Sequence, residues 1–410
     1  MIAVLRMLNR GRSRAERVRA RLVAAGTAVA TFLVCTAVSL ADYDDEGGSL
    51  TGLALALLAL PVAGLVHQAN RLASATREHR LAALRLAGAT PDDVRRLGAM
   101  EGGSLALSGS LLGAAGYMIT HLDGPLPQVP VVVALVTLGG LVSGARAGRH
   151  VVATPLGVVR RARVREPLVR DLLLVVAGLG LLVMGGTEQG RSLLPIRWAA
   201  ALVITAGTVL LLFGVTLAAT WLIRAYARRA GRGTRSAETL VAARLVEADP
   251  RAWARALSVV SLTVFFGAGA GAQQAVVGYS SAHALVDLAL LVALATSAAA
   301  LVVHQAEELI DLRRSFAALA AAGVPERALG GVLVRQAVLA ALPVCVVAAV
   351  AGVLVVIVPQ LGLGDYRAQW LVWAIVRGGL MVGAGVLAAV LVAVAARPLL
   401  RGALSLERRP

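Results

Sequence analysis

Apolar residues occur along the chain in blocks of about 20, separated by short polar segments. A helical block of that length crosses the roughly 30 Å hydrocarbon core of a bilayer. The pattern therefore predicts an all-α integral membrane protein with ten transmembrane helices. The predicted spans are residues 22–41, 51–70, 98–119, 129–144, 168–185, 199–226, 256–276, 284–304, 333–358 and 371–395.

Arginine distribution between the spans predicts how the chain is oriented. The amino terminus, the carboxyl terminus and every second loop are rich in arginine, whereas the alternate loops contain only Arg191, Arg197 and Arg367. Positive charge accumulates on the cytoplasmic side of membrane proteins. We therefore expect both termini in the cytoplasm. The outer loops are short, so we expect no extracytoplasmic domain.

Composition supports this class and excludes others. Hydrophobic residues make up 58% of the 410 residues and the mean hydropathy is +0.78. The net charge of +17 does not indicate nucleic-acid binding, because the arginines lie between apolar blocks and not on an aromatic-interleaved basic surface. The chain has no lysine, so it has no Walker A loop.

No residues suggest chemistry within this chain. Cys35 and Cys345 fall inside predicted spans and are expected to be buried apolar groups. We find no paired acid and base, activated nucleophile or metal-ligand cluster. The sequence thus predicts a protein that is not an enzyme and binds no cofactor itself.

The organising feature is a break within the segment 77–113. A charged amphipathic stretch ends at Gly88, which suits the left-handed end of a helix. Thr90 is then predicted to cap a new helix with Pro91 at its first position, and the two aspartates that follow face the positive end of the helix dipole. We call this helix–turn–helix the first elbow.

A degraded copy, the second elbow, begins at Arg313. Aligning Gly88 with Gly323 also aligns Glu101 with Gln336. The copy has Val324 where the cap is expected, so we predict a looser or differently shaped turn. Capped cytoplasmic turns are common in membrane proteins, but a turn repeated with its flanking sequence favours docking of a cytoplasmic partner.

At these residues the sequence resembles the FtsX-like permease domain of ABC transporters. The matching residues are Arg77-Glu78, Leu81-Ala82-Ala83-Leu84-Arg85, Gly88-Ala89-Thr90, Arg95-Arg96 and Glu101. The resemblance implies two four-span units, 1–150 and 240–410, joined by a two-span hairpin within 151–239. It implies a bacterial plasma-membrane permease whose partner, a separate cytoplasmic ATPase dimer, binds ATP and Mg. Unlike many relatives, the chain lacks a large outer domain, and its second elbow lacks the Arg-Glu start.

By this likeness, nucleotide-driven closure of the ATPase is passed to the spans through the two elbows. The implied docking residues are Arg77, Glu78, Arg80, Arg85, Gly88, Thr90, Pro91 and Asp92 in the first elbow, and Arg313, Arg314, Gly323, Pro325 and Glu326 in the second. The substrate is expected to be a hydrophobic or membrane-active compound that is exported or acted on mechanically. A secondary transporter and a non-transporting regulator that acts through an ATPase are the alternatives.

Two carboxylates in the spans could line a translocation path. Glu101 lies near the start of span 98–119, where pairing with nearby Arg95 or Arg96 is the alternative, and Asp287 lies near the outer end of span 284–304. Helix packing is predicted at glycine pairs with small-xxx-small spacing. These pairs are Gly109/Gly113, Gly140/Gly144 and Gly267/Gly271.

Overall fold

The computed structural model describes residues 14–41, 66, 88–120, 127–153, 171–192, 197–277, 281–311, 313–361 and 368–406. All regular structure in these segments is helical. The helices are α2 (Arg14–Ala41), α5 (Pro91–Thr120), α6 (Gln128–Ala153), α7 (Asp171–Gly186), α8 (Glu188–Ser192), α9 (Arg197–Gly233), α10 (Ala237–Ala248), α11 (Pro250–Val277), α12 (Ser281–Asp311), α13 (Arg313–Ala321), α14 (Glu326–Leu361) and α15 (Ala368–Leu406).

Seven of these helices are long and apolar enough to cross a bilayer, which makes the chain an all-helical, multi-pass membrane protein. They are α2, α6, α9, α11, α12, α14 and α15. Two further predicted spans coincide with α5, whose glycines, serines and Glu101 lower its hydropathy, and with α7, which is only 16 residues long. The predicted span 51–70 lies outside the described residues, apart from a helical Val66.

The chain divides into two compact units, residues 1–164 and 165–410. In the first unit, α2, α5 and α6 pack against one another. Gly109 and Gly113 of α5 lie so close to α2 that a Cβ atom on either would collide with the carbonyl oxygen of Ala24 or Ala28. The predicted glycine pair of α6 likewise meets the main chain of α5. Small residues therefore set these two helix contacts, as the spacing predicted.

In the second unit, α11, α14 and α15 repeat the pairwise packing of α2, α5 and α6. Their shared core includes Leu257, Val264 and Cys345. The third predicted glycine pair, on α11, faces side chains of α15 at Met381 and Arg377.

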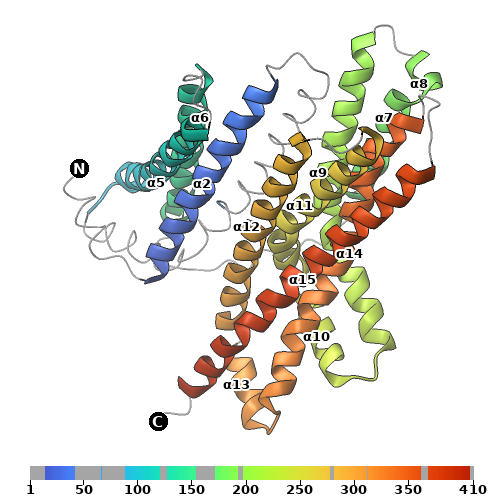
Figure 1. The fold of residues 1–410 in the computed structure, drawn as a ribbon. Coiled ribbons are helices and arrows are strands. Elements are labelled where there is room, and N and C mark those ends of the chain that lie inside the picture. The colour runs from blue at the N-terminus through green and yellow to red at the C-terminus, as the bar shows by residue number, and fades with distance from the viewer. Residues whose placement is uncertain are drawn as a thin grey trace. The chain divides into compact units, whose positions relative to one another are not determined.

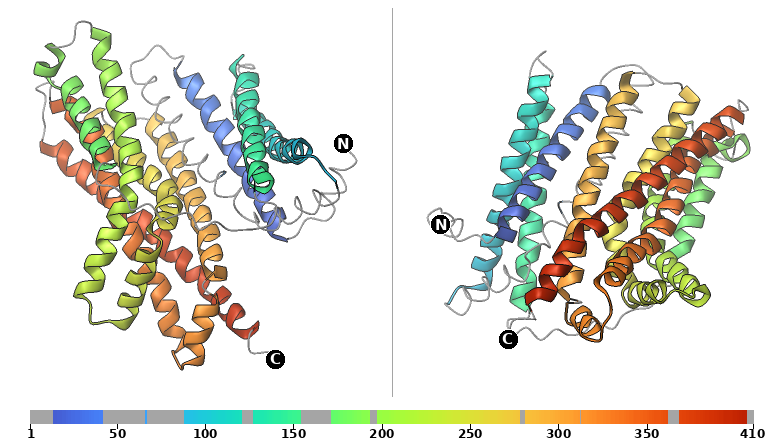
Figure 2. Two further views of the ribbon diagram at one scale, coloured as in Figure 1. Left: turned by 180° about the vertical axis from the view of Figure 1, so that it is seen from behind. Right: turned by 60° about the horizontal axis from the view of Figure 1, so that its bottom comes forward.

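The central hairpin consists of α7 and α9 and belongs to the second compact unit. Gly178 and Gly207 bring the two helices together, and both helices also pack against α14. Within this unit, α10, α13 and the last turns of α15 lie at one end and α8 lies at the other (Figure 1). Further views show the same separation of the two ends (Figure 2). The described arginine-containing helix α10, the start of α13 and the end of α15 thus lie at the same end of this unit.

Candidate functional site

The first elbow has the capping geometry that the sequence predicts. Gly88 has a φ angle of +96°, in the left-handed region that favours glycine. The main-chain N–H of Asp93 donates to Thr90 Oγ1 at 3.2 Å, and the N–H and hydroxyl of Thr90 donate to Asp93 Oδ2 at 3.0 and 2.6 Å. Pro91 is the first residue of α5. These bonds form a reciprocal capping box that fixes the direction in which α5 leaves the turn.

Asp93 has a role that sequence reasoning did not separate from that of its neighbour. Asp92 is exposed and pairs with Arg95 at 3.5 Å, whereas Asp93 completes the capping box. Hydrogen bonds from the hydroxyl and the N–H of Thr90 lower the pKa of the Asp93 carboxyl below its ordinary value. The signal that identifies Asp93 is its spacing of three residues from the capping threonine.

The second elbow has the same glycine conformation but is closed by main-chain bonds. Gly323 has a φ angle of +92°. Its N–H donates to the carbonyl of Ala320 at 3.1 Å, and the N–H of Val324 donates to that of Leu319 at 3.1 Å. This bond pair is a Schellman motif, which satisfies the last carbonyl groups of α13. The glycines of the two elbows therefore have the same left-handed conformation.

The predicted cap of the second elbow is corrected by the structure. Pro325, and not Val324, immediately precedes α14, and its carbonyl accepts a hydrogen bond from the N–H of Ala328 at 3.0 Å. The turn is also not loose. Val324 packs against an apolar cluster that includes buried Phe316 of α13 and Leu329 of α14, so side-chain packing holds the two arms together.

The structure describes only some of the remaining predicted docking residues. Arg313 and Arg314 form the first turn of α13, and Gly323, Pro325 and Glu326 are exposed. Gly88, Thr90 and Asp92 are exposed in the first elbow. Arg77, Glu78, Arg80 and Arg85 lie outside the described residues.

Thirteen residues beyond each elbow glycine, a polar side chain joins two helices of its own unit. Arg19 Nη1 of α2 donates to Glu101 Oε1 of α5 at 3.3 Å, and the Arg19 side chain is only 2% exposed. In the second unit, Gln336 Nε2 of α14 donates to Glu308 Oε1 of α12 at 3.1 Å. Each helix that leaves an elbow is therefore fastened to a neighbouring span at the same distance from its turn.

Glu101 thus has a structural partner in the protein. The partner is Arg19, from the basic segment before the first predicted span, and not Arg95 or Arg96, which are exposed. In the second unit, the ring of His304 lies edge-on to Trp253 at 5.0 Å and its Nε2 is 3.8 Å from Glu308 Oε2.

Asp287, the second candidate path residue, forms an ion pair between α12 and α15. It accepts a hydrogen bond from Arg377, whose aliphatic stem passes over Gly271 of α11. Sequence reasoning missed Arg377 because a single arginine inside the apolar block 371–395 does not change the prediction of a span. The glycine beneath Arg377 provides the room that its side chain needs.

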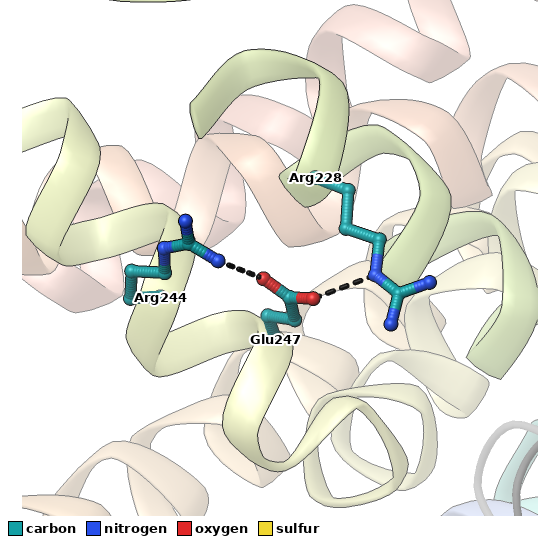
Figure 3. A network of polar contacts seen from close by, with 3 residues as sticks. All are labelled: Arg228, Arg244 and Glu247. Carbon is teal, nitrogen blue, oxygen red and sulfur yellow. Dashed lines mark hydrogen bonds and ion pairs between the residues drawn. The ribbon is translucent and has the colours of Figure 1, made fainter. Parts of the chain in front are cut away.

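A further polar network fastens α10 to its neighbours. Glu247 at the end of α10 accepts hydrogen bonds from Arg228 Nε of α9 at 2.6 Å and from Arg244 Nη1 at 3.0 Å (Figure 3). The bond from Arg228 lowers the pKa of the Glu247 carboxyl. At the other end of α10, Arg335 of α14 donates to Thr239 at 2.7 Å. The arginine-rich segment 227–255, between the predicted spans 199–226 and 256–276, is therefore mostly helical and is bonded to two spans.

Comparison with known proteins leaves the resemblance without independent support. No family model, curated protein or solved structure matches the chain. Among the described residues, no three His, Cys, Asp or Glu side chains are grouped as metal ligands would be. The described residues form two exposed turns, and each turn leads directly into a helix that is bonded to a neighbouring span.

Proposed function

We propose that this chain is the transmembrane permease subunit of an ABC-type system in the bacterial plasma membrane. In this proposal ten spans place both termini in the cytoplasm, and a separate ATPase dimer docks on the two elbows. Hydrolysis of ATP by the partner drives export of, or mechanical work on, a hydrophobic or membrane-active compound.

The repeated elbow carries the proposal. Both elbows pair a left-handed glycine with a helix start, and both have small, exposed residues at the turn. A force applied to Thr90 or Glu326 would be transmitted along a continuous helix to Glu101 or Gln336. It would then reach the span to which that side chain is bonded. Turns that are fixed by hydrogen bonds suit transmission of movement better than flexible loops do.

Copurification tests the proposal. The tagged chain, expressed in its native host, should retain a nucleotide-binding protein with a Walker A loop and stimulate its ATPase activity. The variant Arg80→Glu/Arg85→Glu should lose both the retention and the stimulation, because two positive charges are reversed in the first elbow. Retention and stimulation equal to those of the unmodified chain would refute the docking assignment.

The Asp287–Arg377 pair favours a second candidate, a secondary transporter. Ionisable residues inside spans often belong to ion or substrate pathways. A transporter of this kind would move its substrate in proteoliposomes that contain only this chain and an ion gradient. Transport that requires ATP and a second subunit would exclude it.

A further inference from the structure

The helix α10 is held where the apolar lengths of two spans end. At its beginning, Arg335 of α14 donates to Ser236 and Thr239 and pairs with Glu238 at 3.0 Å. Arg335 follows the predicted start of an apolar span, residue 333, by two positions. At its other end, Glu247 binds Arg228, two residues after the predicted span 199–226. Both ends of α10 therefore lie beside predicted span ends, which places this helix near one boundary of the membrane in the proposed topology.

The surrounding segment has an excess of positive charge. Residues 227–255 contain seven arginines and three acidic residues. Each acidic residue already has a partner: Glu238 pairs with Arg335, Glu247 binds Arg228 and Arg244, and Asp249 accepts the N–H of Ala252 at 3.0 Å. Each of these three carboxylates therefore already interacts with a group outside the three arginines described next.

Three arginines at the corner between α9 and α10 remain without such a partner. Arg229, Arg232 and Arg235 are exposed, and no hydrogen bond or ion pair joins them to the described part of the chain. Glu238 stands three residues after Arg235 and could have paired with it, but Arg335 of another helix holds that carboxylate. We call these three arginines the basic corner.

Apolar side chains are exposed beside the basic corner. Leu240 is 41% exposed and Val241 is 38% exposed on α10, although the other face of this helix is buried at Ala242, Ala243 and Val246. Arginines next to exposed apolar residues are typical of helices that lie in the headgroup region of a bilayer. Exposure of both apolar side chains to water is unfavourable, and contact with lipid would remove that cost.

We propose that the basic corner binds the phosphate headgroups of anionic lipids at the inner membrane surface, while Leu240 and Val241 enter the adjoining acyl region. A bilayer suits this position better than the docked ATPase does. The tip of the second elbow at Glu326 lies nine residues before Arg335, or about 14 Å further along α14 from the membrane boundary. This site goes beyond the proposed function and does not depend on an ATPase partner.

Native mass spectrometry of the purified full chain tests the site. The detergent-solubilised protein is mixed with equal amounts of phosphatidylglycerol and phosphatidylcholine that carry the same acyl chains. We expect preferential binding of phosphatidylglycerol. Since each basic residue near an anionic surface contributes roughly a fivefold factor, the variant Arg229→Gln/Arg232→Gln/Arg235→Gln should reduce that preference by at least about tenfold. The single variant Arg232→Gln should give an intermediate value.

The matched control for Arg232→Gln is Arg327→Gln, which removes one exposed arginine beside the tip of the second elbow, eight residues before Arg335. It should keep the preference for phosphatidylglycerol. An unchanged preference in the basic-corner variant would overturn the proposal, as would an equal loss in the control. Release of a copurifying acidic protein by the basic-corner variant, with lipid binding unchanged, would assign the surface to a protein and also overturn it.

Discussion

Loss of the Glu101–Arg19 pair should loosen α2 from α5 without affecting the second unit. The test substitution is Glu101→Gln, which places in the first unit the residue that the second unit has at the aligned position. The two side chains are 14% and 2% exposed. Removing one partner of a buried ion pair costs about 3–5 kcal/mol, and the partial exposure of Glu101 favours about 3 kcal/mol. Separation of the helices should therefore become roughly a hundredfold more frequent.

Two native cysteines report this separation. Cys35 on α2 is 3% exposed and packs in one apolar cluster with Tyr117 of α5, and Cys345 is 1% exposed in the second unit. Local opening lets a small maleimide reach a buried thiol. In the full-length Glu101→Gln protein we expect Cys35 to react about a hundredfold faster. Cys345 should react at its original rate.

Two further variants make the result specific. Arg95→Gln removes an exposed pair and should leave both thiols unaffected, since exposed pairs contribute little. Arg19→Met/Glu101→Leu replaces both buried charges with apolar groups and should restore most of the protection of Cys35. An unchanged rate at Cys35 in Glu101→Gln would refute the reasoning, and an equal increase at both cysteines would show a global effect.

Three other predictions concern the elbows and α10, and hydrogen exchange measures each of them. Gly88→Ala and Gly323→Ala should each destabilise the elbow concerned by about 1 kcal/mol through the left-handed conformation alone, since no atom lies within 4 Å of the added Cβ; clearly unequal effects would contradict a common origin in the glycine conformation. The first capping box should persist above the ordinary pKa of Asp93 and be lost as the pH falls through the lowered value, and Thr90→Ala should abolish this pH dependence. Arg335→Gln should raise exchange in α10 about fivefold, the effect of about 1 kcal/mol for a partly exposed charged contact, with α12 unchanged.

Local features of the elbows could be predicted from the sequence because they depend on neighbouring residues. The left-handed glycines and the threonine cap are set by preferences that act over three or four positions. The sequence predicts the cap of the second elbow one residue too early, at Val324, because a proline without a capping side chain gives no signal for the boundary. The hydrogen bonds that close the second elbow join main-chain groups. Because these groups are common to all residues, the sequence does not indicate which of them pair.

The partners of the charged residues could not be predicted, because they are separated widely along the chain. Arg19 and Glu101 are 82 residues apart, and Arg377 and Asp287 are 90 residues apart. The sequence places Arg19 in the arginine-rich amino-terminal segment and Arg377 in an apolar span, and charge counts cannot show which helices pack together. Packing of the hairpin on α14 likewise depends on tertiary contacts at glycines such as Gly186, where a Cβ atom would meet the main chain of Pro359.

Site-specific photocrosslinking from the elbows tests the central claim most directly. A benzophenone side chain is introduced at Asp92, at Arg327 or, as the outer control, at Gln189 of α8, all of which are exposed. In native membranes both elbow positions should crosslink to a protein with a Walker A loop, and position 189 should not. Absence of such a product from both elbows, or the same product from position 189, would contradict the account.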